Sequence, residues 1–306
     1  MLRKPSECGF IRIFARIEMM RRESDISSRL RLAAFAVLLI AASGCFAAFA
    51  QIMGNDKSLT DSLRMEFDNT PYFTLFHDNY FAVGTDPFHK ITKNNSDVKF
   101  QVSIAQRLTK STLPGHTFLF LAFTQQVMWD VFKNSMPMHD FTFNPGIGVS
   151  KPLFSKDRYI GKATLMLEHM SNGRDSTASR SWNRITLGTI IMIDDMLAVD
   201  GKFWIPIVDG ENNRDILKYT GLFSGGFQVT SRDKKWGGAL HLTKRKTWHM
   251  SFNISAQLFW RPWKQANQYF FIDWYNGYGE NLLDYNQWHN RIRVGLLIRP
   301  KFFSEF

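Results

Sequence analysis

Cysteine is almost absent from the chain, which has only Cys8 and Cys45 among its 306 residues. Both lie before residue 51, in a segment with the features of a secretory signal. The rest of the chain contains no cysteine and therefore forms no disulfide bond. The stability of the secreted part must come from other interactions.

Long apolar runs are also scarce, and the only one suited to a membrane helix spans 32–50. The basic stretch MRRESDISSRLR, which starts at Met20, precedes this run, and the small residues AFA end it. A basic segment, an apolar segment and a small-x-small site are typical of a secretory signal peptide. We predict that residues 1–50 form this peptide, with cleavage between Ala50 and Gln51. Residues 1–19 are superfluous to it, and the true start can be Met19 or Met20.

A second type of processing stays open at Cys45. This cysteine follows ASG and resembles a lipoprotein acylation site, although Ala42 stands where a larger aliphatic residue is usual. Acylation at Cys45 is therefore the alternative to cleavage after Ala50.

The secreted part has an excess of positive charge. Of the 38 basic and 27 acidic residues, eight and four lie in 1–50, which leaves 30 against 23 and a net charge of +7. A secreted protein rarely meets nucleic acid, so we expect no nucleic-acid partner. The charge is better explained by a surface that faces anionic lipid.

Helical periodicity, internal repeats and Pro- or Ser-rich linkers are scarce after Gln51, and no further stretch reaches the 18 apolar residues of a membrane helix. Alternation of apolar and polar residues is what recurs instead. Clear examples are DVKFQVSIAQ (97–106), FLFLAFTQQVMW (118–129) and SFNISAQLF (251–259). A period of two predicts β-strands with one apolar face. Turn-forming residues at 94–97, 111–116, 209–215 and 231–235 indicate antiparallel hairpins.

Two all-β architectures fit this pattern: a soluble sandwich and an outer-membrane β-barrel. The barrel is favoured because the strands are about ten residues long, which suits a tilted strand that crosses a membrane. Their alternate face carries Lys, Gln, Asn and Ser, as a barrel interior does, and the chain ends in an aromatic residue, Phe306. Aromatic residues at the predicted strand ends indicate an interfacial girdle: Trp129, Trp182, Trp248, Trp260, Tyr269 and Tyr278.

One polar hairpin combines residues that can perform catalysis. The strands ATLMLEHMS (163–171) and SWNRITLGTI (181–190) flank the loop 172–180. An antiparallel register then pairs Ser171 with Ser181, His169 with Asn183, Leu167 with Ile185, and Leu165 with Leu187. The leucines share a face with the polar residues, so in a barrel this face is turned toward lipid.

This arrangement provides a nucleophile, a base and an orienting group. Ser171 needs a base to take its proton during attack, and His169 can be that base. Asn183 can accept a hydrogen bond from the other imidazole N–H and fix the tautomer. The Asn172–Gly173 turn can present backbone N–H groups to an oxyanion, and a nearby cation can add to that stabilisation. The alternative is that these are incidental polar residues at a membrane edge.

The same residues resemble the active-site segment of the bacterial outer-membrane phospholipase A family. HMSNGRDSTASRSWNR (169–184) matches the family pattern His-x-Ser-Asn-Gly, a short loop, then Ser-Arg-Ser-Trp-Asn. Further segments resemble family segments in the same order: SDVKFQVSIAQRL (96–108), FTQQVMW (123–129), FNPGIGVSKPL (143–153), KYTG (218–221) and NGYGENLLDYN (276–286). Several separated motifs are more specific than one short match.

The resemblance implies a 12-stranded antiparallel barrel over residues 51–306 in the outer membrane of a Gram-negative bacterium. It implies calcium-dependent hydrolysis of phospholipids and lysophospholipids, by phospholipase A1 and A2 activity, in a homodimer. By position, Ser171, His169 and Asn183 correspond to the catalytic residues and Gly173 to the oxyanion N–H. The implied calcium ligands are the Arg174 carbonyl, the Ser179 hydroxyl and Ser135 of the partner subunit, the last by a gapped alignment.

The roles of Asp175 in the loop and of Gln125 in the barrel wall each have an alternative. The family usually has an aspartate seven residues after the histidine, where this chain has Ser176, with Asp175 one position earlier. Asp175 can still reach the metal because calcium accepts variable oxygen geometry; otherwise it is a solvated loop charge. Gln125 shares an apolar face, and the resemblance places it in the dimer interface. The alternative for Gln125 is a residue that faces the barrel interior.

Three classes of protein thus stay open at this stage. The first is a calcium-dependent phospholipase of the outer membrane. The second is a non-enzymatic barrel, either a pore or a structural protein, with an incidental polar hairpin. The third is a soluble periplasmic β-protein.

Overall fold

The computed structural model describes residues 61–300 except 156–157, 208–210, 248 and 264–265. The predicted signal peptide 1–50, Cys45 and the C-terminal Phe306 lie outside the described residues.

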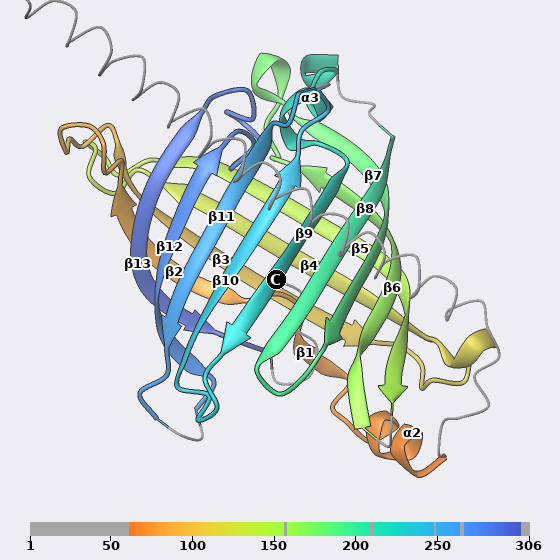
Figure 1. Cartoon of the computed structure of the whole chain (residues 1–306). Helices are drawn as coiled ribbons and strands as arrows, with labels where there is room; N and C mark the ends of the chain where they lie inside the picture. The colour runs from red at the N-terminus through yellow and green to blue at the C-terminus, as the bar shows by residue number, and fades with distance from the viewer. Residues whose placement is uncertain (1–60, 156–157, 208–210, 248, 264–265, 301–306) are drawn as a thin grey trace, which may run out of the picture.

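The chain forms a closed antiparallel β-barrel (Figure 1). From β3 to β13 each strand pairs with the next in sequence, and β13 pairs with β2, which in turn pairs with β3. The prediction of twelve barrel strands is therefore confirmed. They are β2 (Asn79–Thr85), β3 (Ser96–Arg107), β4 (Phe118–Trp129), β5 (Met138–Ser155), β6 (Arg158–Ser171), β7 (Ser181–Met192), β8 (Leu197–Ile207), β9 (Phe223–Thr230), β10 (Trp236–Lys244), β11 (Phe252–Trp260), β12 (Gln268–Gly277) and β13 (His289–Ile298).

A short strand, β1 (Phe73–Leu75), lies along the same edge of β3 as β2 does. It pairs with residues 104–106 of β3, whereas β2 pairs with residues 96–101. Strands β1 and β2 therefore occupy the same position in the order of strands around the barrel, one beyond the other along β3.

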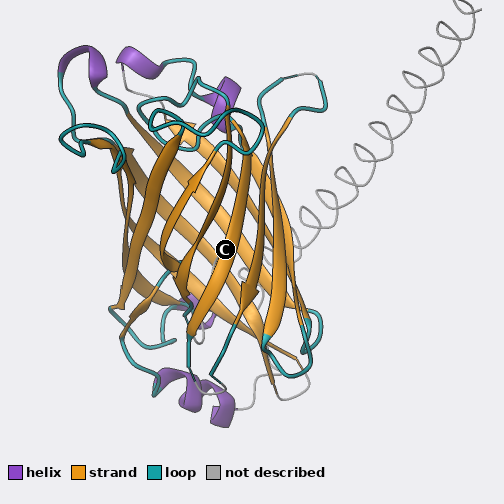
Figure 2. Cartoon of the chain, turned by 90° about the vertical axis from the view of Figure 1, so that its left-hand side faces the viewer, coloured by secondary structure: helices purple, strands orange, loops and turns teal. Residues whose placement is uncertain are grey.

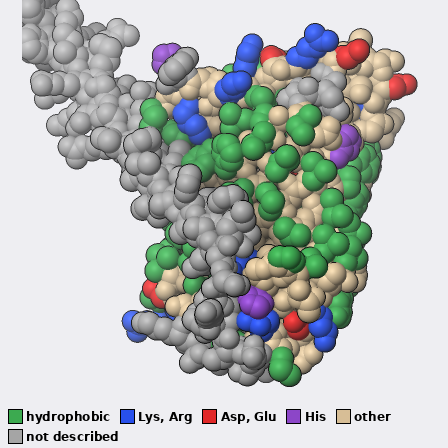
Figure 3. All heavy atoms as spheres, turned by 90° about the vertical axis from the view of Figure 1, so that its right-hand side faces the viewer, with side chains coloured by type: hydrophobic (Ala, Val, Ile, Leu, Met, Phe, Trp, Pro, Cys, Tyr) green, Lys and Arg blue, Asp and Glu red, His purple; other side chains and the backbone are tan. Residues whose placement is uncertain are grey.

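The two faces of the wall have opposite chemistry, as the alternation predicts. In β6, Leu165 and Leu167 are exposed on the outer face, whereas Met166 and Glu168 are buried on the inner face. Hydrophobic side chains form a belt on the outside, with charged residues above and below it (Figure 3). A sandwich would bury this apolar face, so the soluble alternative is wrong.

The helices are short and lie at the ends of the barrel (Figure 2). They are α2 (Asp61–Asp68), α3 (Leu217–Thr220) and the 3-10 turns η1 (Pro114–His116), η2 (Ser176–Ala178) and η3 (Glu211–Asn213). No helix in the described part of the chain is long and apolar enough to cross a membrane.

The two ends of the barrel differ in the lengths of their loops. Long loops at 86–95, 130–137, 172–180 and 278–288 gather at the end where α3 lies (Figure 1). The end where α2 lies has the shorter turns 193–196 and 231–235 and one long loop, 108–117. Outer-membrane barrels have short periplasmic turns and longer extracellular loops. The α3 end is therefore the extracellular end.

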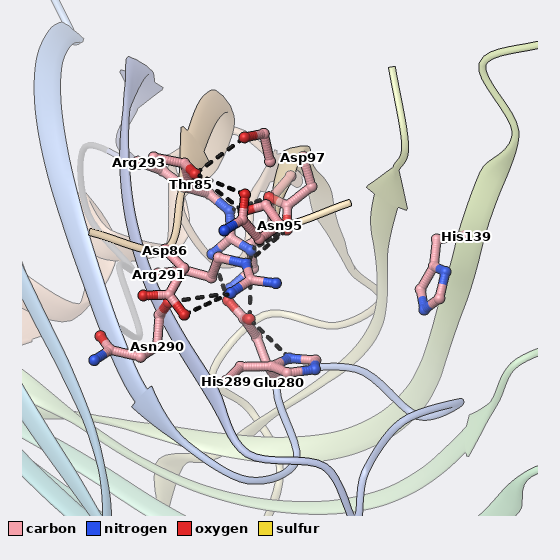
Figure 4. Close-up of polar contacts among 12 residues, drawn as sticks. Thr85, Asp86, Asn95, Asp97, His139, Glu280, His289, Asn290, Arg291 and Arg293 are labelled. Carbon is pink, nitrogen blue, oxygen red and sulfur yellow. Dashed lines mark hydrogen bonds and ion pairs between the residues drawn. The ribbon is translucent and has the colours of Figure 1, made fainter. Parts of the chain in front are cut away.

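The loop 278–288 enters the barrel from the extracellular end and is held there by charge (Figure 4). Glu280 is fully buried and forms ion pairs with Arg293 (2.5 Å) and Lys99 (3.4 Å). Arg293 also binds Asp97 at 2.6 Å. Burial alone would raise the pKa of Glu280, but these two cations hold it well below its usual range. The loop thus forms a charged plug in the lumen.

The aromatic girdle is only partly as predicted. Trp260 is exposed on the outer face and stacks on Trp236, with ring centroids 5.5 Å apart. The prediction is wrong for Trp182, which is 1% exposed and packs with Trp204 inside the barrel. It is also wrong for Tyr269, which packs against the buried Phe259 and Phe271 on the inner face. Trp182 was assigned to the girdle because it lies at a strand end, but it alternates with Asn183 and therefore points inward. Trp248 lies outside the described residues.

Candidate active site

The predicted register of the polar hairpin is confirmed in every pair. Strand β6 opposes β7 with Ser171 beside Ser181, His169 beside Asn183, Leu167 beside Ile185, and Leu165 beside Leu187. The imidazole Nδ1 of His169 and the amide Oδ1 of Asn183 lie 2.7 Å apart. An amide oxygen can only accept, so Nδ1 carries the proton and Nε2 is the basic nitrogen.

The site opens on the lipid-facing side of the barrel. Ser171, His169 and Asn183 are half-buried, and the next residues on the same face, Leu167 and Ile185, are exposed apolar side chains. Ser171 lies two residues beyond His169, about 6.6 Å along the strand. Among the described residues, no hydrogen bond joins the Ser171 hydroxyl to the imidazole. The structure therefore brings the base and its orienting group together and places the serine beside them.

The loop after Ser171 is organised by Asn172, whose side chain the sequence analysis did not single out. Asn172 is 2% exposed. Its Nδ2 donates to the Ala178 carbonyl at 2.9 Å, and its Oδ1 accepts from the Arg180 N–H at 2.9 Å. One amide side chain thus holds the two ends of the loop together. The turn-forming residue pair Asn172–Gly173 was the available signal.

Gly173, the proposed oxyanion donor, has a backbone conformation that favours glycine. Its φ is +63°, a left-handed conformation that glycine adopts without strain. A Cβ atom built on Gly173 would lie 3.0 Å from the ring of Phe143. Conformation and space therefore both favour glycine next to the serine.

Arg174 fixes the loop to strand β5. Its Nη2 donates to the His139 carbonyl at 2.5 Å, and its Nε lies 3.8 Å from Asp140. Asp140 is buried and accepts the backbone N–H groups of Leu282 and Leu283 at 3.0 and 2.9 Å. The hairpin loop is thus connected through β5 to the plug loop.

The plug loop has two further contacts near the site. Asp284 lies 2.5 Å from the imidazole of His139, and this hydrogen bond lowers the pKa of Asp284. Tyr285 is buried against Trp182, the neighbour of Asn183, and its hydroxyl donates to Asp215 at 2.6 Å. Burial, followed by this bond to Asp215, raises the pKa of Tyr285 to about 12.

On the inner face, directly behind the His169–Asn183 pair, lies a buried ionic contact. Glu168 pairs with Arg184 at 2.9 Å in the next rung of the two strands. Thr186 and Asn144 also donate to the Glu168 carboxylate. These bonds tie β5, β6 and β7 together behind the site. No pattern in the sequence predicted this contact.

Three of the four predicted calcium ligands, Arg174, Asp175 and Ser179, lie on one loop. Asp175 precedes η2 and is exposed, and Ser179 follows η2 and is half-buried. Ser176 has a positive φ of +50°, and its carbonyl accepts from Asn212 at 2.8 Å. Within the described residues there is no group of three or more His, Cys, Asp or Glu side chains that could hold a metal. The loop instead offers the Arg174 carbonyl, the Ser179 hydroxyl and the Asp175 carboxylate. Oxygen donors of this kind suit calcium.

Gln125 lies in one row with the candidate nucleophile. Across neighbouring strands, Gln125 pairs with Phe143, and Phe143 pairs with Ser171. The neighbouring Gln126 points inward, where it donates to the Glu280 carbonyl at 2.8 Å. The alternative that Gln125 faces the interior is therefore wrong. Gln125 and Ser171 lie on the outer face two strand spacings apart, or about 9.5 Å.

Ser135 lies in the turn between β4 and β5, at the same end as the site. It is exposed and has a φ of +63°. It follows the end of β4, the strand that carries Gln125, by six residues.

A closed barrel with a serine, a histidine and an asparagine on its apolar face defines a class of membrane-embedded hydrolases that act on lipid. The comparisons with known proteins agree. A family model described as Phospholipase A1 matches residues 67–298, and the chain belongs to this family.

Curated relatives named phospholipase A1 match over most of their length. The protein of Klebsiella pneumoniae is 28% identical over 299 residues, which cover 90% of this chain and 100% of the relative. That of Proteus vulgaris is 28% identical over 218 residues, which cover 68% and 72%.

Solved structures share the fold. An outer membrane phospholipase dimer of Salmonella typhi with bound calcium superposes with a TM-score of 0.65 and 21% identity, covering 82% of this chain and 97% of the other. The outer membrane phospholipase A of Escherichia coli gives a TM-score of 0.64 at 22% identity, covering 74% and 93%.

The prediction of an outer-membrane phospholipase is confirmed. The non-enzymatic barrel and the soluble β-protein are no longer competing classes.

Proposed function

We propose that this barrel hydrolyses acyl ester bonds of membrane phospholipids and lysophospholipids with Ser171 as nucleophile, His169 as base and Asn183 as orienting group. The observation that carries the proposal is the 2.7 Å contact between His169 and Asn183 on the apolar face, next to Ser171. A hydrolytic group that faces the bilayer has lipid as its substrate. Residues 1–50 are removed as a signal peptide before the barrel reaches the membrane.

The reaction follows from the positions of the protons. Nε2 of His169 takes the proton of Ser171 as Oγ attacks the ester carbonyl carbon. The bond from that carbon to the alcohol oxygen breaks, and the imidazolium returns the proton to the leaving alcohol. Water then attacks the acyl-serine with the same base, which releases the fatty acid and restores Ser171. Asn183 holds the imidazole in the reactive tautomer throughout.

The oxyanion receives its hydrogen bond from the backbone N–H of Gly173. This group follows the nucleophile by two residues, and Asn172 and Arg174 hold the loop that carries it. Preorganised donors of this type stabilise the charge that develops on the carbonyl oxygen.

Calcium is the cofactor that suits the loop. The Arg174 carbonyl, the Ser179 hydroxyl and the Asp175 carboxylate would hold it, and Ser135 of the partner subunit would complete the site. When bound, the ion supplies positive charge near the oxyanion. The solved relative described with bound calcium supports this proposal.

Homodimerisation would activate the enzyme by joining the two surfaces that contain Gln125. The row Gln125–Phe143–Ser171 on the outer face supports a site at the edge of that surface. A glutamine that faces lipid is costly unless paired, so the expected partner is polar and lies across a two-fold axis. The related protein of Salmonella typhi is described as a dimer.

The assay that tests the catalytic proposal is fatty acid release from a phospholipid in detergent micelles. Asn183→Ala should lower kcat by about 10- to 100-fold, because a hydrogen bond to a charged group contributes ~1.5–3 kcal/mol. Asn94→Ala, which changes an exposed asparagine of the loop 86–95 whose hydrogen bond to Thr92 is made by the backbone N–H, is the matched control and should retain most activity. Equal kcat in wild type and Asn183→Ala would refute the role of Asn183.

The dimer is tested by association in detergent. Gln125→Ala should shift the monomer–dimer equilibrium toward monomer by about 3- to 10-fold in Kd, since one hydrogen bond contributes about 0.5–1.5 kcal/mol. Analytical ultracentrifugation with added calcium measures this. The inward-facing Gln126→Ala is the control and should dimerise like wild type. If Gln125→Ala does so too, its interface role is wrong.

A further inference from the structure

A hollow of about 490 Å³ lies at the extracellular edge of the outer face, where β9 begins and β10 ends. Its lining combines the apolar residues Leu222 and Phe223 with the basic residues Lys244, Arg245 and Lys246. Phe223 pairs with Phe203, an exposed residue of the apolar belt, and with Lys244 on the other side. The hollow therefore lies where the apolar belt ends and the polar loops begin.

Two backbone features gather the positive charges. Lys244 Nζ donates to the carbonyls of Arg245, Thr247 and His249, at 2.8, 2.9 and 2.9 Å, and folds the loop around itself. The Lys246 N–H donates to the Leu217 carbonyl at 3.3 Å, which joins this loop to α3 and its exposed Lys218. Carbonyl groups have no net charge, so Lys244 keeps its net positive charge at the hollow, although these bonds use all three of its Nζ donors.

These cations lack acidic partners within the described part of the chain. No ion pair joins Lys218, Lys244, Arg245 or Lys246 to a carboxylate there, although Arg245 lies over the Tyr278 ring at 5.0 Å. Arg293 in the lumen, in contrast, forms ion pairs with Asp97 and Glu280. Four like charges repel one another unless an anion lies among them. The cluster is therefore electrostatically complementary to an anionic group.

We propose that this basic hollow binds a phosphorylated glycolipid of the outer leaflet, with its phosphate among the cations and an acyl chain along Phe223 and Phe203. The long-loop end faces outward, so the lipid at this height belongs to the outer leaflet. Basic residues at a membrane surface attract anionic lipid head groups, and the apolar wall of the hollow suits an acyl chain.

The hollow contains none of the proposed catalytic residues, although β9 lies two strands from β7, which carries Asn183. Strand β10 lies six strands from β4 in a ring of twelve, on the opposite side of the barrel from Gln125. The hollow stays open to lipid in both the monomer and the proposed homodimer. It serves as an anchor for a structural lipid, and its occupation does not depend on Ser171.

The proposal is tested by binding of lipid A to the purified full barrel in detergent with EDTA present, which removes bridging divalent cations. Lys218→Gln combined with Lys246→Gln should weaken binding of bis-phosphorylated lipid A by roughly 30-fold. Both side chains are exposed, so the variant should fold. The matched control combines Lys90→Gln with Lys93→Gln, two exposed lysines of another extracellular loop, and should bind like wild type.

Two further lipids, dephosphorylated lipid A and phosphatidylglycerol, test whether binding depends on the phosphates of lipid A. Dephosphorylated lipid A should bind wild type as weakly as it binds the Lys218/Lys246 variant. Equal affinity of the two lysine variants for bis-phosphorylated lipid A would overturn the proposal, as would equal affinity of wild type for lipid A and phosphatidylglycerol. The Lys218/Lys246 variant should retain wild-type fatty acid release, which keeps this test independent of the catalytic proposal.

Discussion

Replacing Ser171 with alanine should abolish fatty acid release from phospholipid, with a fall in kcat of roughly 10⁴-fold or more. The loss follows because Ser171 is the proposed nucleophile, two residues from His169 on the same strand and face. Rates are measured in detergent micelles with calcium, and circular dichroism confirms that the variant retains its barrel.

Ser181 provides the matched control for this substitution. It lies directly opposite Ser171 in the β6–β7 ladder and on the same face. Its contacts with Asn213 are made by backbone atoms, so Ser181→Ala keeps them. Near wild-type activity is expected for Ser181→Ala. Release of fatty acid that survives in Ser171→Ala would show that the nucleophile is another group.

Removing calcium should reduce hydrolysis by about 10²- to 10³-fold, because a metal at a developing oxyanion contributes several kcal/mol. Excess EDTA is added to wild type, and the rate is measured again after calcium or magnesium is restored. Calcium should restore activity and magnesium should not, since magnesium requires a more regular octahedral site. Unchanged hydrolysis in EDTA would refute the calcium proposal.

Asp175 and Ser176 compete for the acidic position of the loop, and a calcium titration of activity distinguishes them. Asp175→Ala should raise the calcium concentration at half-maximal activity by about tenfold, because a carboxylate ligand contributes charge that a hydroxyl does not. Ser176→Ala should leave the midpoint within twofold of wild type. The reverse order of the two variants would assign the ligand to Ser176.

The sequence predicted the wall of the barrel well because alternation and register are local properties. A period of two defines which side chains share a face, and a slip by one residue would have moved Ser171 and His169 to the interior. The hairpin loop 172–180 fixed the pairing of β6 with β7, and with it the contact between His169 and Asn183.

The contacts that hold the catalytic hairpin loop in place could not be predicted from local sequence patterns. Arg174 reaches Asp140, and Asp140 reaches the backbone of Leu282, which is 142 positions further along the chain. Contacts of this range depend on how the plug loop enters the closed barrel, and no local pattern encodes them. Asn172 was visible in the sequence only as part of a turn, because its role depends on two backbone groups that the loop brings within reach.

Trp182 shows why residue type misleads at strand ends. Tryptophan is common at membrane interfaces, but this one follows the inward phase of β7 and packs on Trp204 and Tyr285. The phase of the strand, set by Asn183 and Ile185, decides the direction of the side chain.

The most direct test of the central claim is covalent labelling with an alkyl sulfonyl fluoride, followed by peptide mass spectrometry. An activated serine oxygen displaces fluoride and forms a sulfonyl ester. The account predicts one adduct, on Ser171, whose formation stops hydrolysis and is strongly slowed in His169→Ala. An adduct on another serine such as Ser179, with Ser171 unmodified and activity lost, would contradict it.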